Sequence, residues 1–179
     1  ELCLCPIDER GLHIYNCSAG TSRFRPHRAL LLAVARLLKR AGAHVDIERA
    51  CPDLFKLVNP VRSAAASPTS HQCREAILDV VVTFPGSLRQ HRIDVTIHSA
   101  FAASRATAHR VAGCAATDAE KSKEYRYGPS VLPIAFESCG RVGYKSLESI
   151  CFLQQESMIW GSSYFEARAC FRHWRRELE

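Results

Sequence analysis

The sequence predicts a single folded core of the α+β, or mixed α/β, class. Hydrophobic residues switch between helical and β-type periods along the chain, in the order α-β-β-β-α-β-α-α. The length of 179 residues suits one domain with a small appendage. A composition of 47% hydrophobic and 23% charged residues is typical of globular proteins and excludes a disordered tail.

The first expected helix follows a polar connector at residues 18–22. Pro26 suits its first turn, apolar residues recur after it at helical spacing, and Gly42 is placed to cap its C-terminus. Residues 44–48 alternate apolar and polar side chains, which predicts a short strand. The stretch 56–72 is rich in Ser, Ala and Pro and predicts an exposed loop.

Two β-rich runs, 77–84 and 93–98, are joined through Pro85-Gly86. They predict a hairpin, and the length of the connection leaves its register open. An alanine-rich stretch predicts a helix over residues 115–127, and residues 131–137 predict another strand.

Two helices should close the chain. The first carries apolar residues at helical spacing, namely Leu147, Ile150, Cys151 and Met158. The second opens with Ser163-x-x-Glu166, a capping-box pattern, and Phe171 and Trp174 would anchor it to the core.

Four potential metal ligands lie near the start of the chain: Cys3, Cys5, His13 and Cys17. Zn²⁺ takes four such ligands in a tetrahedron, and a structural site of the Cys₃His type is closed. A peptide this short buries little surface, so zinc would supply most of its folding free energy. The alternative is that these are ordinary reduced cysteines, because C-x-C is tighter than the usual spacing. The other six of the nine cysteines show no ligand spacing and are expected to be buried thiols.

Basic residues gather in short clusters, and the net charge of +6 favours a nucleic-acid partner. Arg25, His27, Arg89 and Arg92 are the candidate contacts, since a shared basic face would follow a phosphate backbone. The alternative is that scattered basic residues simply solvate the surface. The longest apolar run, 29–35, is too short and too closely followed by charges to span a bilayer, so no membrane contact is expected.

Two acids interrupt the predicted hairpin strands. Asp79 precedes a Val-Val-Val run, and Asp94 lies within Ile-Asp-Val-Thr-Ile. Acids are depleted in strands, so the presence of these two requires an explanation. If their carboxylates converge, they could hold one hard cation. Lys121 on the following helix would then lower the pKa of a bound water and stabilise developing phosphate charge. The alternative is that both acids are edge residues and that the lysine is a solvated helix residue.

In this order, the segments resemble the C-terminal region of non-LTR retrotransposon proteins, where a CCHC zinc knuckle precedes a restriction-like endonuclease. The resemblance covers roughly residues 3–143. The matching motifs are CLCPIDERGLHIYNC, R-x-H at Arg25 and His27, a strand ending in Glu48, R-x-x-x-x-D-V-V-V with Arg74 and Asp79, D-V-T-I from Asp94, A-E-K-S-K-E-Y from Ala119, and P-I-A-F-E-S-x-G from Pro133.

The resemblance implies a PD-(D/E)XK-type fold, with a central sheet flanked by helices, and Mg²⁺-dependent nicking of DNA. It assigns Asp79 and Asp94 to binding of Mg²⁺ or Mn²⁺ and Lys121 to catalysis, because the family lysine has moved from strand to helix. Thr96 stands where an ordinary restriction nuclease keeps that lysine. Glu137 matches a recurrent family acid and is grouped with the catalytic residues, with a helix-capping carboxylate as the alternative.

The resemblance also divides the chain into a zinc knuckle at 1–20, an endonuclease-like domain at 21–143 and a C-terminal helical extension at 144–179. The Pro that commonly precedes the first family Asp is replaced by Ile77-Leu78. The first hypothesis is therefore a nuclear, metal-dependent DNA endonuclease, as part of a larger polyprotein or assembly. The second is a catalytically inactive derivative that binds DNA or RNA as a structural subunit of a ribonucleoprotein, such as a mitochondrial ribosome. A bare zinc-stabilised interaction module is the third.

Overall fold

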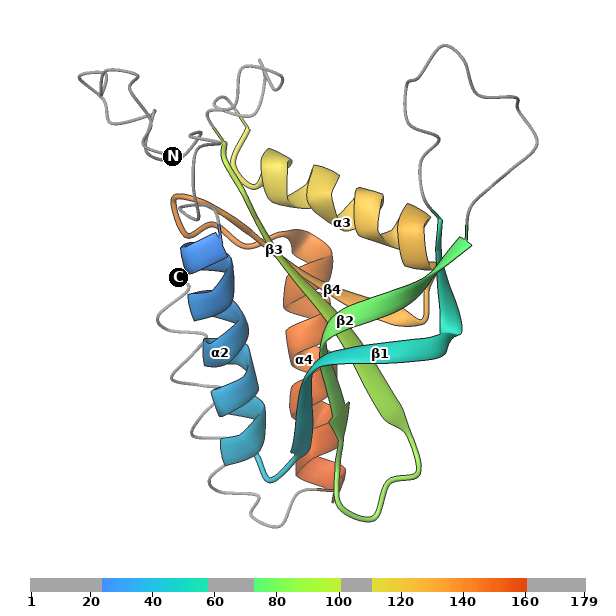
Figure 1. The fold of residues 1–179 in the computed structure, drawn as a ribbon. Coiled ribbons are helices and arrows are strands. Elements are labelled where there is room, and N and C mark those ends of the chain that lie inside the picture. Colours follow the sequence, from blue (N-terminus) through green and yellow to red (C-terminus); the bar gives the residue numbers. More distant parts are fainter. Residues whose placement is uncertain (1–23, 58–72, 101–110, 161–179) are drawn as a thin grey trace.

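One four-stranded sheet organises the protein, and helices cover both of its faces (Figure 1). The computed structural model describes residues 24–57, 73–100 and 111–160. Along these residues the elements are α2 (Phe24–Arg40), β1 (His44–Leu57), β2 (Cys73–Thr83), β3 (Gln90–His98), α3 (Cys114–Tyr127), β4 (Val131–Glu137) and α4 (Tyr144–Trp160). The predicted mixed α+β class is confirmed.

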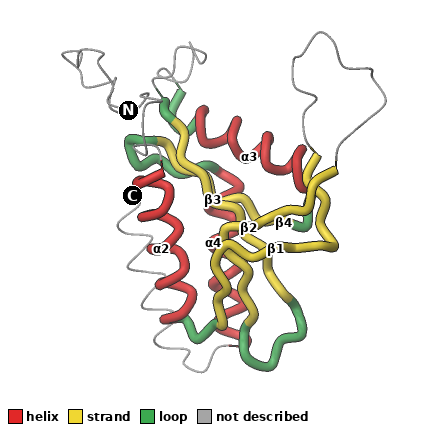
Figure 2. The backbone as a smooth tube through the Cα atoms, viewed as in Figure 1, coloured by secondary structure: helices red, strands yellow, loops and turns green. Residues whose placement is uncertain are grey.

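The sheet is mixed, with the strand order β1-β2-β3-β4. β1, β2 and β3 are antiparallel neighbours, and β4 joins β3 in parallel after a crossover that contains α3. A crossover is required because parallel neighbours cannot be joined by a tight turn. Figure 2 shows that β1 and β2 run together and bend away from the line of β3.

The main core lies between the sheet and the helices α2 and α4, and α3 covers the opposite face (Figure 1). Apolar residues of α2 at helical spacing, Leu31, Val34 and Leu38, are almost fully buried, as the periodicity predicted. They pack with strand residues that point to the same face, among them Val80, Val82, Ile93 and Val95. Ile150 and Leu153 of α4 belong to the same core, so this helix is packed into the domain.

The end of α2 follows the predicted cap. Gly42 has a positive φ of 85°, which L-residues with side chains adopt rarely. Its N–H donates to the carbonyl of Lys39, and the N–H of Ala43 donates to the carbonyl of Leu38. This pair of hydrogen bonds is a Schellman motif, and it directs the chain straight into β1.

The first two strands are longer than the sequence predicted. β1 extends to Leu57, nine residues past the expected end at residue 48, and β2 already begins at Cys73. The Ser/Ala/Pro-rich stretch thus connects two long hairpin strands. A register shift between Cys51 and Phe55 interrupts their ladder, and this bulge hides the strand period in the sequence.

Neither α3 nor α4 has an acidic residue in its own first turn. Carboxylates from other elements take that place. Oε1 of Glu137, at the end of β4, accepts a hydrogen bond from the N–H of Ala115 in α3 over 2.9 Å. Oε1 of Glu120, in α3, accepts from both the N–H and the hydroxyl of Ser146 in α4. Each helix N-terminus is therefore neutralised by a buried carboxylate from another element.

The expectation of buried thiols is wrong at two positions. Cys51 is buried, but Cys139 and Cys151 are exposed. Cys139 lies in the turn after β4, and Cys151 lies on the outer side of α4, where no core is available. Single cysteines carry no periodic signal, so the sequence did not separate these sites from core positions.

Within the described residues, no helix has the length and apolar character that crossing a bilayer requires. The proposed zinc ligands Cys3, Cys5, His13 and Cys17, and the second closing helix, lie outside the described residues.

Gly143→Ala should destabilise the protein, because a Cβ at this position would lie 2.1 Å from Oε1 of Glu120. That carboxylate cannot retreat without losing its hydrogen bonds to Ser146. We expect the free energy of unfolding to fall by about 1–3 kcal/mol, measured by urea denaturation. In a Glu120→Ala background the same change should cost much less, and an equal cost in both backgrounds would contradict the steric explanation.

Candidate active site

The two aspartates singled out in the sequence meet where β2 and β3 separate. Backbone pairing between these strands ends at Val80 and Ile93, and Asp79 and Asp94 occupy the next position of that register. Beyond this point β2 continues beside β1, whereas β3 continues beside β4 (Figure 1). The sheet therefore forks at the two carboxylates. We call Asp79, Asp94 and the side chains that contact them the fork.

The carboxylate of Asp79 fills the opening of the fork. The N–H of Val95 donates to Oδ2 of Asp79 over 2.7 Å. In an uninterrupted ladder this N–H would bind a backbone carbonyl of β2, and leaving it buried and unpaired would cost about 1–3 kcal/mol. The aspartate thus replaces the strand carbonyl that is lost when β2 turns away.

His27 binds the same carboxylate from the first turns of α2. Its Nε2 lies 3.3 Å from Oδ2 of Asp79 and 3.1 Å from the carbonyl oxygen of Val95. Both partners are acceptors, so Nε2 carries a hydrogen and donates. The sequence predicted His27 as a nucleic-acid contact, and the structure instead directs its ring into the fork.

His27 and Asp79 each stabilise the charged form of the other. The hydrogen bond to Asp79 raises the pKa of His27 above its ordinary value, against the opposing effect of burial. Burial raises the pKa of Asp79, but the hydrogen bonds from His27 and Val95 outweigh it and hold that pKa below the ordinary value. Asp79 is therefore a charged carboxylate beside an imidazole that favours its own charged form.

Asp94 faces α3 and is 4% exposed. Its Oδ2 forms an ion pair with Nζ of Lys123, whose side chain is also largely buried. Burial raises the pKa of Asp94, Lys123 opposes that rise, and the adjacent Asp79 carboxylate adds to it, with a raised pKa as the net result. Two carboxylates in contact resist full ionisation, and a cation bound between them would relieve their repulsion.

The lysine beside the acids is Lys123, whereas Lys121 is exposed. A Lys-x-x-x-Tyr spacing occurs twice in α3, as Lys121 with Tyr125 and as Lys123 with Tyr127. The first pair points to solvent, with Tyr125 72% exposed, and the second points to the sheet, with Tyr127 7% exposed. The small residues Ala116 and Ala119 lie on the same inward face, and this helical period is the signal that sequence reasoning missed.

Tyr127 adds a phenol to the surroundings of the acids. Burial raises its pKa, and the negative charge of Asp94 raises it further. Its hydroxyl is consequently neutral in the physiological range and able to donate a hydrogen bond.

Glu48 has the only positive φ of a non-glycine residue among those described, at 54°. It stands across from Asp79 in the β1–β2 register, between two regular pairs. A left-handed conformation costs such a residue about 1–2 kcal/mol, and strain of this kind gathers at functional sites. Its carboxylate accepts a 2.6 Å hydrogen bond from Arg28, the neighbour of His27, so β1 is tied to α2 beside the fork.

Glu137 serves as a helix cap. The β3–β4 register sets it opposite His98, four residues beyond Asp94. Its carboxylate accepts from the N–H of Ala115 and lies 3.9 Å from Arg141. These contacts match the capping alternative that the sequence left open.

The predicted nucleic-acid contacts differ in their surroundings. Arg92 forms an ion pair with Asp53 in the β1 bulge and is only partly accessible. Arg89 is exposed in the connection between β2 and β3. Arg25 lies in the first turn of α2, and its side chain lies outside the described residues.

The fork suits a hard cation that keeps part of its water shell. In the described ranges, no cluster of three or more His, Cys, Asp or Glu side chains is arranged to hold a metal. Mg²⁺ nevertheless often takes one or two carboxylates and completes its shell with water and substrate phosphate. The hydrogen bonds from His27 and Val95 both use Oδ2 of Asp79, and its carboxyl group also contacts that of Asp94, so Oδ1 and Asp94 together can serve as ligands.

Comparisons with known proteins do not assign a family. No protein-family model matches the chain, and neither a curated protein nor a solved structure matches it. The functional argument therefore depends on the residues of the fork.

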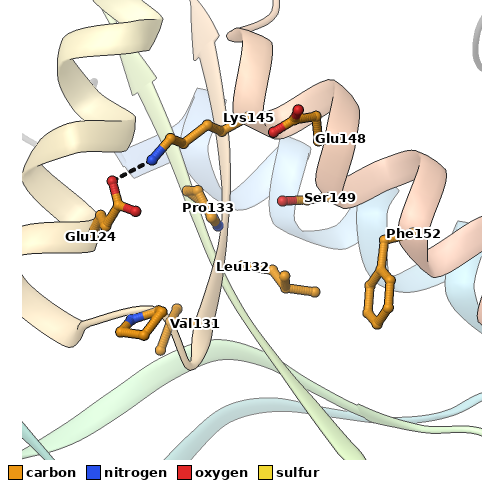
Figure 3. Close-up of a pocket in the computed structure, with 9 residues that line it drawn as sticks. Glu124, Val131, Leu132, Pro133, Lys145, Glu148, Ser149 and Phe152 are labelled. Carbon is orange, nitrogen blue, oxygen red and sulfur yellow. Dashed lines mark hydrogen bonds and ion pairs between the residues drawn. The ribbon is translucent and has the colours of Figure 1, made fainter.

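A separate cavity of about 300 Å³ lies at the β4 edge of the sheet (Figure 3). Val131, Leu132 and Phe152 line it, and an ion pair between Glu124 and Lys145 spans its side. No fork residue contributes to its lining. The cavity offers apolar surface, one ion pair and a second acid, Glu148. Both of its acids are exposed, whereas those of the fork are buried or half-buried, so we place the candidate active site at the fork.

His27→Ala should destabilise the metal-free protein more at about pH 5.5 than at about pH 9. The raised pKa of His27 means that its contribution is complete below its ordinary pKa and is lost as pH rises through the raised value. The lowered pKa of Asp79 means that its contribution is lost only as pH falls well into the acid range. Thermal unfolding in EDTA at both pH values measures the difference. His44→Ala is the control, because the side chain of His44 is 77% exposed and its pair with Asp46 lies at the surface, where such pairs contribute little. An equal loss at both pH values for His27→Ala would contradict the pairing.

Proposed function

We propose that this protein is a metal-dependent endonuclease that nicks DNA by hydrolysing a phosphodiester bond, with the fork as its active site. The observation that carries the proposal is the contact between the carboxyl groups of Asp79 and Asp94, which lie just beyond the last β2–β3 pair, Val80 and Ile93, with Lys123 on Asp94. Two acids and one lysine are the minimal set for hydrolysis of a phosphodiester beside a divalent cation.

Each residue of the fork has a distinct role in this proposal. Bound Mg²⁺ or Mn²⁺ would neutralise phosphate charge and lower the pKa of an attacking water. Asp79 and Asp94 would supply its oxygen ligands. His27 holds Asp79 in one orientation through Oδ2. The ammonium group of Lys123, when Asp94 turns to the cation, can contact the phosphate and stabilise the charge that develops on it.

The arrangement also supports a restriction-like fold of the PD-(D/E)XK type. A mixed sheet has helices on both faces, and the acids lie on adjacent strands of that sheet. The lysine comes from a helix, as the resemblance implies for this family, although it is Lys123 and not Lys121. The N-terminal zinc knuckle, the DNA partner and the nuclear location remain part of the proposal through the resemblance alone.

Lys123→Met should lower the rate of DNA nicking by about 10²–10³-fold in Mg²⁺, because the variant lacks the cation beside the reacting phosphate. Lys121→Met is a matched control on the same helix, and its rate should stay within about threefold of the wild type. Asp94→Asn should abolish nicking. A supercoiled-plasmid assay measures all three rates, and circular dichroism confirms folding.

The two lysine variants separate the possible assignments. A large loss in Lys121→Met with little loss in Lys123→Met would move catalysis to Lys121 and contradict the role proposed for Lys123. Nicking that persists in Asp94→Asn would remove the fork as the active site.

One observation favours a second function, the non-catalytic nucleic-acid-binding subunit of a ribonucleoprotein. The two acids of the fork already have two cationic partners, His27 on Asp79 and Lys123 on Asp94. A closed network of this kind balances its charges without a metal and can serve to fix the fold.

Binding of Mn²⁺ distinguishes the two functions without any substrate. For the endonuclease, Mn²⁺ at ten times its dissociation constant should raise the melting temperature of the wild type by about 3 °C. The rise should vanish in Asp79→Asn, because this variant lacks one ligand charge. Absence of any rise in the wild type would favour the structural subunit.

A further inference from the structure

The outer side of α4 is unusually apolar for a surface helix. Three of its five buried residues are serines, namely Ser146, Ser149 and Ser157. Away from these serines, Tyr144 is 70% exposed, Leu147 is 42% exposed and Cys151 is exposed, with Glu148 and Gln155 exposed beside them. A helix that packs on one side alone normally shows the reverse distribution. This pattern indicates that the outer side of α4 is covered by another element.

The outer residues of α4 are spaced like a helix–helix seam. Five residues follow intervals of three and four, and we call this set the outer stripe: Tyr144, Leu147 and Cys151, which are exposed, and Gln154 and Met158, which are half-buried. Alternating intervals of three and four are the a and d positions of a heptad, which pack against one partner helix. The spacing therefore indicates a helix as the covering element.

The chain itself supplies a segment with the same spacing. Directly after α4 and the Gly161-Ser162 pair, apolar residues recur at intervals of three and four: Tyr164, Ala167, Phe171, Trp174 and Leu178. The chain from Ser163 to its last residue is as long as α4, which has 17 residues. A short connection that begins with Gly is typical of two antiparallel helices.

We propose that the outer stripe of α4 is the docking surface for residues 163–178 of the same chain, which pack on it as an antiparallel helix. The inference does not depend on the proposed nuclease activity, because it uses no residue of the fork. The closing segment then belongs to the domain and covers Tyr144 and Leu147, with the thiol of Cys151 at the edge of the contact.

One facing pair beside the two stripes, Glu148 with Arg175, joins opposite charges in this arrangement. Glu148 and Gln155 follow the d positions of α4, and Arg168 and Arg175 follow the d positions of the closing segment. Antiparallel packing around residues 161–162 sets Glu148 opposite Arg175 and Gln155 opposite Arg168. Residues that flank an a/d seam form the ion pairs that fix partner and orientation, so charge selects this occupant.

Charge exchange on the full-length chain tests the proposal. Glu148→Arg and Arg175→Glu should each lower the melting temperature by about 1–3 °C, and the double variant should recover most of the loss. Glu148→Arg combined with Arg176→Glu is the matched control, since the neighbouring arginine lies off this side, and it should not recover. If the decreases in melting temperature of the two single variants simply add in the Glu148/Arg175 double variant, the proposal is overturned.

Cross-linking of native cysteines gives a second measurement. Cys151 lies in the outer stripe, and Cys170 lies beside Phe171 in the closing segment. A short bismaleimide should link Cys151 to Cys170 within one monomer, identified by peptide mapping, while Cys139 should not link to Cys170. A link between the Cys151 residues of two chains would mean that a second copy covers the stripe, and it would overturn the proposal. The absence of any link to Cys170 would do the same.

Discussion

The hydrogen bond from the N–H of Val95 to the carboxylate of Asp79 completes the sheet at the point where β2 leaves β3. When a strand bends away, the backbone N–H and C=O groups of its neighbour lose their partners, and a buried unpaired N–H is costly. An acidic side chain at this position compensates, because it can reach across the opening. Its charge then brings in His27 from α2, and the strained Glu48 ties β1 to the same helix. The bend of the sheet and the chemistry of the fork thus have one cause.

A second set of buried carboxylates positions the lysine of the fork. Glu137 caps α3, the helix that carries Lys123, and Glu120 on the same helix caps α4. Buried acids are expensive unless hydrogen bonds and a helix N-terminus offset the loss of water. Oε1 of each glutamate meets both conditions, whereas Oε2 of Glu120 is buried without a hydrogen-bond partner among the described residues. Gly143 has no side chain because the carboxylate of Glu120 occupies that space. Displacing either acid would shift α3 against the sheet and move Lys123 away from Asp94.

The fork has the same residues whether it acts as an enzyme or as a structural network. Asp79 is held charged by His27, while the pKa of Asp94 is raised by burial despite Lys123. Environments that push the pKa values of two neighbouring acids apart are common in catalytic sites. They also occur in ion-pair networks that only stabilise a fold. What distinguishes the functions is whether a divalent cation displaces Lys123 from Asp94. The outcome depends on which of the two, the cation or the lysine ammonium, binds the Asp94 carboxylate with the more favourable free energy.

Local pattern was enough to predict most of the secondary structure, because the period of α2, the Schellman glycine Gly42 and the β-branched runs around Asp79 and Asp94 are signals within one segment. The anomaly of acids in strands also singled out the two aspartates that the structure brings together. Three features depend on contacts between residues far apart in the chain: the lysine that lies beside Asp94, which is Lys123 and not Lys121; the contact of His27 with Asp79; and the capping of α3 by Glu137. Only the tertiary structure decided these, because each depends on the register of two strands and on the helix face that packs against them.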